Sequence, residues 1–319
     1  MMRLSIAVVA LFLAVASQAR AEMVAVTFDD VPYLSLTNDL AYQRTTTREL
    51  LRGLRRNHIP AIGFVNEIKL EGADKPQRIA LLRAWLNAGM DLGNHSYSHI
   101  SLTNTPVADY IADVARGERV TRPLMAARGE APHWYRHPYL ETGASADSRA
   151  AFETWLGEHG YRVAPVSMEN SDWVFALPYD DAILHGDKAD AQRIRRSYLD
   201  FTAKVVPWYQ EAAQEVLGRK PAFVLLLHAS RLNADSIDDL DRILKADGLK
   251  PAPLHRAMKD PAYAIADPYI GPDGDEWVAR WSMALHRPVP WKALPEPEPE
   301  IVAEDARLDD DQVKTAAGQ

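Results

Sequence analysis

The stretch VAVTFDDVPY, at residues 24–33, joins an apolar run of strand length to two adjacent carboxylates, Asp29 and Asp30. A short run of such residues, several of them β-branched, is typical of a buried β-strand. Two neighbouring carboxylates gain nothing from burial and repel each other. The pair therefore needs a partner that compensates its charge, and a nearby cation would do so.

Working outward from this stretch, apolar runs of strand length alternate with amphipathic segments of helix length, which predicts an α/β fold with a mainly parallel sheet. Strands are expected at Met23–Thr27, Ile59–Val65, Met90–Gly93, His133–Tyr135, Arg162–Val166, Ala222–Leu227 and Pro251–Leu254. Helices are expected around Tyr42–Arg56, Gln77–Ala88, Val107–Ala127, Ser145–His159, Ala189–Val216 and Ser236–Ala246, with Trp277 and Trp281 on a further helix. Seven strands with intervening helices suggest a barrel, whose functional groups sit at the carboxyl ends of the strands.

The chain opens with a segment that is typical of a secretory signal peptide. MMRLSIAVVALFLAVASQARA carries Arg3, an apolar run over residues 4–16, and small residues at Ala19 and Ala21. This pattern predicts cleavage after Ala21 and a secreted or periplasmic protein. A membrane anchor is the competing interpretation, but the run is shorter than the roughly 20 residues that a span needs. We therefore expect no membrane span after cleavage.

The amino-acid composition limits which covalent links, metal sites and binding partners the protein can have. The chain has no cysteine, which excludes disulfides and thiolate zinc sites. Its formal net charge is −8, and removing Arg3 and Arg20 with the leader makes the remainder still more acidic. This charge argues against a nucleic-acid partner and favours a neutral or sugar-like substrate.

The C-terminal residues 296–319 have a different composition from the rest of the chain. The PEPEPE repeat at residues 295–300 leads into them, and acidic residues without apolar periodicity follow. Such a segment cannot bury enough apolar surface to fold alone. The sequence predicts an acidic disordered tail at 296–319, which leaves residues 22–295 as one domain.

A second unusual stretch is GNHSYSH, at residues 93–99, directly after a predicted strand. His95 and His99 are four residues apart, so a single helical turn would point both imidazoles the same way. In a barrel, this stretch and the Asp29–Asp30 pair would share one rim. One carboxylate and two imidazoles suit zinc or a similar divalent ion, with positions left open for water. The neighbouring carboxylate would remain free to act as a base.

Five short blocks now resemble a known family. They are TFDD at 27–30, HSYSH at 95–99, RHPY at 136–139, SDW at 171–173 and LLLH at 225–228, and IPAIGFVN at 59–66 looks like the family's second strand. In this order they resemble the polysaccharide deacetylases of carbohydrate esterase family 4, the nodulation-type deacetylase domain. The resemblance runs from about Met23 to His228. It implies a distorted (β/α)7 barrel, with residues 22–295 as the catalytic domain, that hydrolyses acetyl groups from sugar polymers with one divalent metal, zinc or alternatively cobalt.

The resemblance also implies a role for each matching residue. The catalytic group would be Asp29 as general base, Arg136 as the residue that orients it, His228 as general acid and Asp172 as the partner that tunes this histidine. The metal ligands would be Asp30, His95 and His99. The substrate-binding residues would be Tyr139, whose backbone N–H helps to hold the oxyanion, Trp173 as a wall of the groove, and Leu226 beside the acetyl methyl group.

Two positions depart from the family pattern. The glycine that usually follows the R-x-P-Y block is delayed to Gly143, which predicts a longer or differently shaped loop beside the site. Glu169 stands where an aspartate is common, three residues before Asp172. Both departures bear on the substrate more than on the reaction.

The favoured function is removal of the N-acetyl group from a glucosamine-containing glycan. The alternatives are an esterase for O-acetylated xylan, a non-catalytic barrel that binds glycans, and a hydrolase of related fold that acts on a small amide. An acid and a base that face one metal argue against a pure binding protein.

Overall fold

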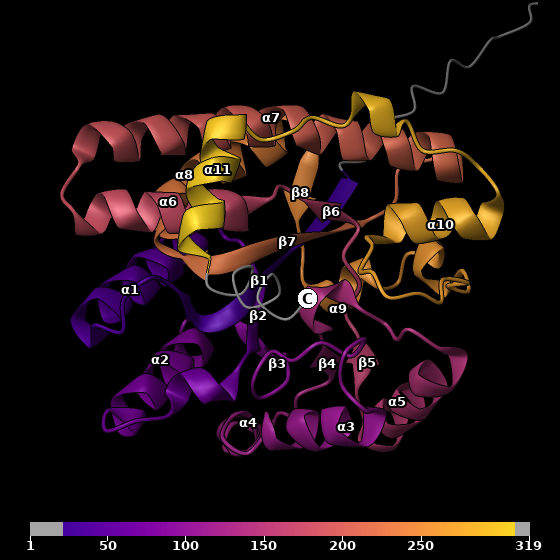
Figure 1. The fold of residues 1–319 in the computed structure, drawn as a ribbon, viewed down its shortest axis with the longest axis horizontal. Helices are drawn as coiled ribbons and strands as arrows, with labels where there is room; N and C mark the ends of the chain where they lie inside the picture. The colour runs from indigo at the N-terminus through magenta and orange to yellow at the C-terminus, as the bar shows by residue number, and fades with distance from the viewer. Residues whose placement is uncertain (1–21, 310–319) are drawn as a thin grey trace, which may run out of the picture.

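The structure is a computed structural model that describes residues 22–309, so the predicted leader at 1–21 lies outside the described residues. A parallel sheet occupies the centre of the molecule, and helices surround it (Figure 1). The strands are β1 Glu22–Leu34, β2 Ala61–Val65, β3 Asp91–Asn94, β4 Trp134–Tyr135, β5 Arg162–Val163, β6 Met168–Glu169, β7 Phe223–Ser230 and β8 Leu249–Pro251.

Seven strands follow the order β5-β4-β3-β2-β1-β7-β6, and β8 pairs with the start of β1 beside this path. Every pairing is parallel. β1 is therefore the central strand although it is the first in the described chain. This order places the carboxyl ends of β1, β2, β3, β4 and β7 along one rim, as the alternation of strands and helices predicts.

The helices pack around the sheet (Figure 1). They are α1 Leu40–Arg56, α2 Lys75–Asn87, α3 Val107–Arg116, α4 Thr121–Ala126, α5 Ala146–Glu158, α6 Asp172–Leu184, α7 Lys188–Leu217, α8 Arg231–Ala246, α9 Leu254–Ala257, α10 Trp277–Leu285 and α11 Pro299–Leu308. Short 3-10 turns are η1 Glu67–Leu70, η2 Pro138–Leu140, η3 Pro261–Ala264 and η4 Trp291–Ala293. No helix among the described residues is both long enough and apolar enough to cross a bilayer.

Most expected elements are present, and the differences have local causes. The predicted strand at Pro251–Leu254 lies earlier, at β8, because Pro253 precedes α9 and Leu254 begins that helix. β6 was not among the expected strands, because its two residues are too few to show the alternation of a strand. The helix around Trp277 and Trp281 is α10, and Trp281 is buried against the core.

The expected helix Val107–Ala127 is instead two helices, α3 and α4. Gly117 caps the end of α3. A Cβ atom at Gly117 would lie 2.6 Å from the backbone carbon of Ser96. The helix therefore ends where it meets the loop that carries the two histidines, and the chain restarts at Thr121.

The prediction of a disordered tail at 296–319 is wrong for its first half. Residues 299–308 form α11, which packs against α6. Ile301 is fully buried, and Glu304 receives two hydrogen bonds from Arg193 of α7 at 2.8 and 2.9 Å. A fully buried isoleucine and an ion pair to α7 thus anchor a helix whose acidic composition suggested disorder. Residues 310–319 lie outside the described part of the chain.

Candidate active site

The acidic pair sits at an irregularity in β1. The pairing of β1 with β2 shifts register between Phe28 and Val31, and Asp30 has a φ of 63°. Successive side chains of a regular strand point to opposite faces. A backbone in the left-handed region re-aims the side chain, as bulges next to functional sites do. The irregularity therefore brings Asp29 and Asp30 to the same rim.

Asp30, His95 and His99 form the one cluster of potential metal ligands found among the described residues. One ligand atom from each lies within 4.8 Å of the others. Asp30 comes from β1, whereas the histidines follow β3. The predicted ligand set thus meets at the carboxyl ends of two strands, with β2 between them.

The histidine stretch is not a helical turn, so the reason expected for its convergence is wrong. Residues 95–100 form an irregular loop in which Ser96 and His99 have φ values of 64° and 57°. Two short hydrogen bonds fix it: Asn94 Oδ1 accepts from the Ser96 N–H at 2.8 Å, and Ser96 Oγ accepts from the His99 N–H at 2.9 Å. The imidazole rings lie edge to face with centroids 4.8 Å apart.

The electrostatics of this cluster fit a divalent cation. Burial lowers the pKa of His95 to about 3 and that of His99 to about 4, so both imidazoles are neutral at pH 7. Nδ1 of His95 lies 2.9 Å from the carbonyl oxygen of Arg136, which leaves Nε2 as the ligand atom. Asp29 Oδ1 and Asp30 Oδ1 are buried without a hydrogen-bond partner. Two neutral imidazoles and an unpaired carboxylate oxygen are a donor set that suits zinc.

Asp30 keeps its charge in this buried position. Burial by itself raises the pKa of Asp30, but Lys69 and then His99 outweigh burial and hold this pKa far below its ordinary range. The Lys69 ammonium lies 3.2 Å from Asp30 Oδ2. Asp30 is therefore ionised throughout the neutral range.

Asp29 has a different environment from its neighbour. Its Oδ2 lies 3.3 Å from Nη1 of Arg136, a fully buried side chain that also donates to Thr27 Oγ1 at 3.0 Å and to the Ala164 carbonyl at 2.9 Å. Burial raises the pKa of Asp29 to about 6, and Arg136 limits the rise. Asp29 is a carboxylate that can take up a proton near neutral pH.

His228 lies beside Asp29, because β1 and β7 pair these two residues directly. Nδ1 of His228 is 2.8 Å from Asp172 Oδ1, and Asp172 Oδ2 accepts the His228 backbone N–H at 2.7 Å. Burial alone disfavours the charged imidazole, but Asp172 outweighs it and raises the pKa of His228 to about 9. The site therefore holds a charged histidine next to a carboxylate, as an acid and base pair requires.

The remaining predicted residues lie around this pair in different degrees of exposure. Trp173 begins α6 next to Asp172 and is 38% exposed, and Tyr139 is 48% exposed. The Tyr139 ring packs edge to face on His99 with centroids 4.5 Å apart. Leu226 is 6% exposed and pairs with Thr27 and Glu169 on the neighbouring strands. Two aromatic side chains are thus exposed near the site, whereas Leu226 is buried in the sheet.

The loop that contains Tyr139 has an unusual backbone. Tyr139 and Leu140 have φ values of 54° and 56°, and Gly143 has a φ of 119°. The loop is held from behind, since Arg280 donates to the Leu140 carbonyl at 3.0 Å. A Cβ atom at Gly274 would lie 1.7 Å from the Tyr139 carbonyl oxygen, so only glycine fits there. The loop that ends at Gly143 is therefore strained, and the buried side chain of Arg280 supports it.

Glu169, the second departure, belongs to a pair of carboxyl groups. Burial first, and then the neighbouring Glu276, raise the pKa of Glu169 to about 8. Glu276 accepts a hydrogen bond from Tyr209 at 3.3 Å. Glu169 is thus protonated at neutral pH and adds no negative charge beside Asp172.

Sequence reasoning missed two residues of the site. Asn233 of α8 donates to Asp172 Oδ2 at 2.5 Å and to the His228 carbonyl at 2.8 Å. Lys69 of η1 contacts Asp30. The position of Lys69 shortly after a strand offered the same signal as that of His95. Asn233 lies inside a helix, where nothing in the sequence distinguishes it.

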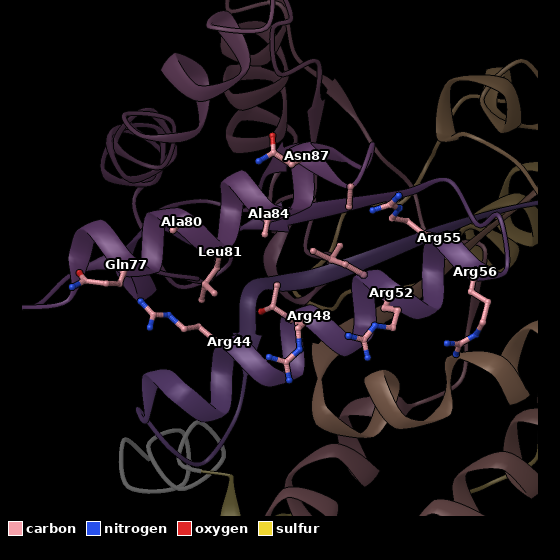
Figure 2. A pocket seen from close by; sticks show the side chains of 13 residues that line it. Arg44, Arg48, Arg52, Arg55, Arg56, Gln77, Ala80, Leu81, Ala84 and Asn87 are labelled. Carbon is pink, nitrogen blue, oxygen red and sulfur yellow. The ribbon is translucent and has the colours of Figure 1, made fainter.

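A groove of about 830 Å³ lies away from this site, between α1 and α2 (Figure 2). Five arginines of α1 line it, namely Arg44, Arg48, Arg52, Arg55 and Arg56. Small and apolar side chains of α2, such as Ala80, Leu81 and Ala84, line it as well. None of the predicted site residues lines this groove.

Comparison with known proteins identifies relatives of this chain. A family model described as polysaccharide deacetylase matches residues 16–162. A peptidoglycan-N-acetylglucosamine deacetylase from Bacillus cereus is 27% identical over 150 residues, which are 47% of this chain and 46% of that protein. The match thus spans about half the length of this curated relative.

Several solved structures are similar to this chain. The chitin deacetylase from the fungal pathogen Colletotrichum lindemuthianum has a TM-score of 0.51 at 21% identity, over 75% of this chain and 88% of that one. A family 4 carbohydrate esterase from Streptomyces lividans has a TM-score of 0.46 at 21% identity, over 72% and 92% of the two chains. The polysaccharide deacetylase of Bacillus cereus has a TM-score of 0.49 at 19% identity, over 73% and 91%. The similarity to the chitin deacetylase, together with the order of seven parallel strands in the sheet, confirms the predicted distorted (β/α)7 barrel.

Proposed function

We propose that this chain, which a polysaccharide deacetylase family model matches over residues 16–162, is a metal-dependent hydrolase that removes acetyl groups from a glycan. The favoured target is the N-acetyl group of a glucosamine-containing glycan. One observation carries the proposal: β1 and β7 pair Asp29 directly with His228, beside the cluster of Asp30, His95 and His99.

Zinc is the favoured metal, with cobalt as the alternative, and Asp30, His95 and His99 would hold it. When bound, the ion supplies Lewis-acid activation of the attacking water and of the acetyl carbonyl. The neutral state of both imidazoles and the unpaired Oδ1 of Asp30 support this assignment.

The chain's own residues move the protons. Asp29 accepts a proton from the attacking water, and Arg136 holds its carboxylate in place from 3.3 Å. His228 donates a proton to the leaving nitrogen, because Asp172 keeps its imidazole charged at neutral pH. An amine leaves poorly without such protonation, so this arrangement suits an amide substrate.

The surface around the site suits a sugar chain. Trp173 and Tyr139 are exposed aromatic side chains at its border, and aromatic rings offer an apolar face to bound ligands. The Tyr139 N–H would help to hold the oxyanion, and Leu226 would lie beside the acetyl methyl group. The leader at residues 1–21 supports a secreted or periplasmic location, where such glycans occur.

A panel of acetylated oligosaccharides tests the proposal. Zinc-loaded protein is incubated with N-acetylglucosamine oligomers, acetylated xylo-oligomers and small acetamides, and the products are analysed by mass spectrometry. We expect loss of acetyl groups from the N-acetylglucosamine oligomers, abolished by a chelator and restored by zinc or cobalt. The Asp29→Asn variant is the matched control, because it should keep the metal and lose the base.

The panel also separates the alternatives. Turnover of xylo-oligomers alone would identify an O-acetyl esterase, and turnover of acetamides alone a small-amide hydrolase. Binding of oligomers without release of acetate would leave a glycan-binding barrel. Full turnover by protein that elemental analysis shows to be free of metal would refute the metal site.

A further inference from the structure

Lys69 makes three contacts to the turn that carries the acidic pair. Its ammonium lies 3.2 Å from Asp30 Oδ2 and donates to the carbonyl oxygens of Asp30 at 3.5 Å and Tyr33 at 3.2 Å. The side chain is 23% exposed, and that of Asp30 is 15% exposed. This is a largely buried ion pair with a carboxylate that belongs to the metal cluster.

The two oxygens of Asp30 have different environments. Oδ2 faces Lys69, whereas Oδ1 is buried without a hydrogen-bond partner. Because Oδ1 is the unpaired oxygen, it is the one left for a ligand. Lys69 thus divides the carboxylate into one oxygen that is satisfied by the chain and one that is free.

We propose that Lys69 is a positioning residue that serves as a built-in counter-cation of Asp30: it occupies Oδ2, leaves Oδ1 for the metal, and weakens the affinity of the site for a divalent ion. The inference rests on the metal site of the proposed function and adds a determinant of its affinity. Without Lys69, both oxygens of Asp30 are open to the ion.

Two effects of Lys69 oppose each other, and their relative size decides the sign. Lys69 helps to hold Asp30 in its left-handed conformation, with a φ of 63°, which favours metal binding. It also places a positive charge 3.2 Å from the carboxylate that would hold a divalent cation, in a poorly solvated site. Charge repulsion between a dication and an ammonium at such a distance exceeds the contribution of two hydrogen bonds to carbonyl groups. Removal of the charge should therefore strengthen metal binding.

The test measures zinc affinity rather than turnover. Metal-free wild type, Lys69→Met and Lys69→Gln are titrated with zinc by isothermal titration calorimetry at one pH and ionic strength. Lys69→Gln keeps a donor for the Tyr33 carbonyl without the charge, so it keeps the test valid if Lys69→Met does not fold. We expect both neutral variants to bind zinc at least about tenfold more tightly than wild type.

Lys75→Met is the matched control. Lys75 begins α2, six residues after Lys69, and forms a surface ion pair with Glu71 at 2.8 Å, with 40% of its side chain exposed. Loss of this pair should leave zinc affinity unchanged. Lys69→Arg, which retains the charge, should bind zinc as wild type does.

Thermal unfolding gives a second readout. Metal-free Lys69→Met should unfold at a lower temperature than metal-free wild type, because the buried Asp30 carboxylate loses its counter-cation. Saturating zinc should then raise its unfolding temperature by more than it raises that of wild type. Equal or weaker zinc binding by both neutral variants would overturn the role of Lys69 and leave the metal site standing. Absence of zinc binding from every variant and from wild type would overturn both.

Discussion

Asp29 and Asp30 are neighbours in the chain, but their pKa values are shifted in opposite directions. Burial raises the pKa of Asp29 to about 6, whereas Lys69 and His99 hold that of Asp30 far below its ordinary range. A carboxyl group that takes up a proton near neutral pH is suited to be a base, and one that stays ionised is suited to bind a cation. The environment of each residue therefore assigns its role.

Exchanging each carboxylate for its amide tests this division. Asp29→Asn should keep zinc content near that of wild type and reduce turnover by roughly 10²–10⁴, which is the usual contribution of a positioned base. Asp30→Asn should reduce zinc content itself. Elemental analysis and acetate release, measured on the same preparations, check both. Equal loss of zinc from the two variants would mean that the roles are divided wrongly.

The charged state of His228 predicts an alkaline limit of activity. A general acid works while it is protonated, so turnover should fall as pH rises through about 9, the pKa of His228. In Asp172→Asn the partner that raises this pKa is lost, and burial, which lowers it, remains. The alkaline limb of the pH profile should therefore move to lower pH in this variant. An unmoved limb would show that another group sets it.

For individual residues, the sequence predicted the proposed catalytic side chains better than the side chains that contact and position them. Asp172 and His228 follow strands and stand in short motifs, so their positions were apparent. Asn233 contacts Asp172 only because α8 folds back onto the end of β7, and a contact of that kind has no local signal. Lys69 reaches Asp30 through side-chain packing, which a sequence pattern does not specify.

Among the elements, α11 shows how composition can mislead. Glu298 precedes it and Pro299 begins it, and its acidic residues obscure a single apolar anchor, Ile301. A helix held by tertiary packing needs few apolar residues of its own. The structure places this helix on α6, the helix that begins with Asp172, so the C-terminal segment supports an element of the site.

Two neighbouring substitutions in α11 measure this support. Ile301→Ala should lower the free energy of unfolding by about 2–5 kcal/mol, because it leaves a cavity at a fully buried position. Val302→Ala, at a position that is 44% exposed, should change it by less than about 0.5 kcal/mol. Denaturant unfolding of both variants and wild type supplies the comparison. Equal stability of all three would show that α11 is not anchored in solution.

The loop at residues 95–99 shows that helical spacing in the sequence does not always produce a helix. Residues 95–99 have a spacing that suits a helix, yet Asn94 and Ser96 side chains capture the backbone N–H groups and bend the chain into the left-handed region. Such local hydrogen bonds compete with helix formation. The convergence of His95 and His99 was predicted correctly, but a different geometry produces it.

For the whole molecule, the alternation of strands and helices was sufficient to predict the fold class, and the rule that parallel strands share one functional edge was sufficient to gather the site. Strand order was beyond reach, because β1 lies between β2 and β7 rather than at an edge. That order depends on pairing between distant segments, which the sequence of each strand does not reveal.

The central place of β1 also governs when the protein can become compact. The hydrogen bond from Thr27 to Leu225 spans 198 positions of the chain. A ribosome delivers β1 first and β7 much later, so the middle of the sheet stays incomplete through most of synthesis. Pairings this distant in sequence make folding slow, since a long loop must close before they are gained. The strand that holds the acidic pair is therefore the first of the described strands to be made, and it pairs with β2 long before β7 can complete its other side.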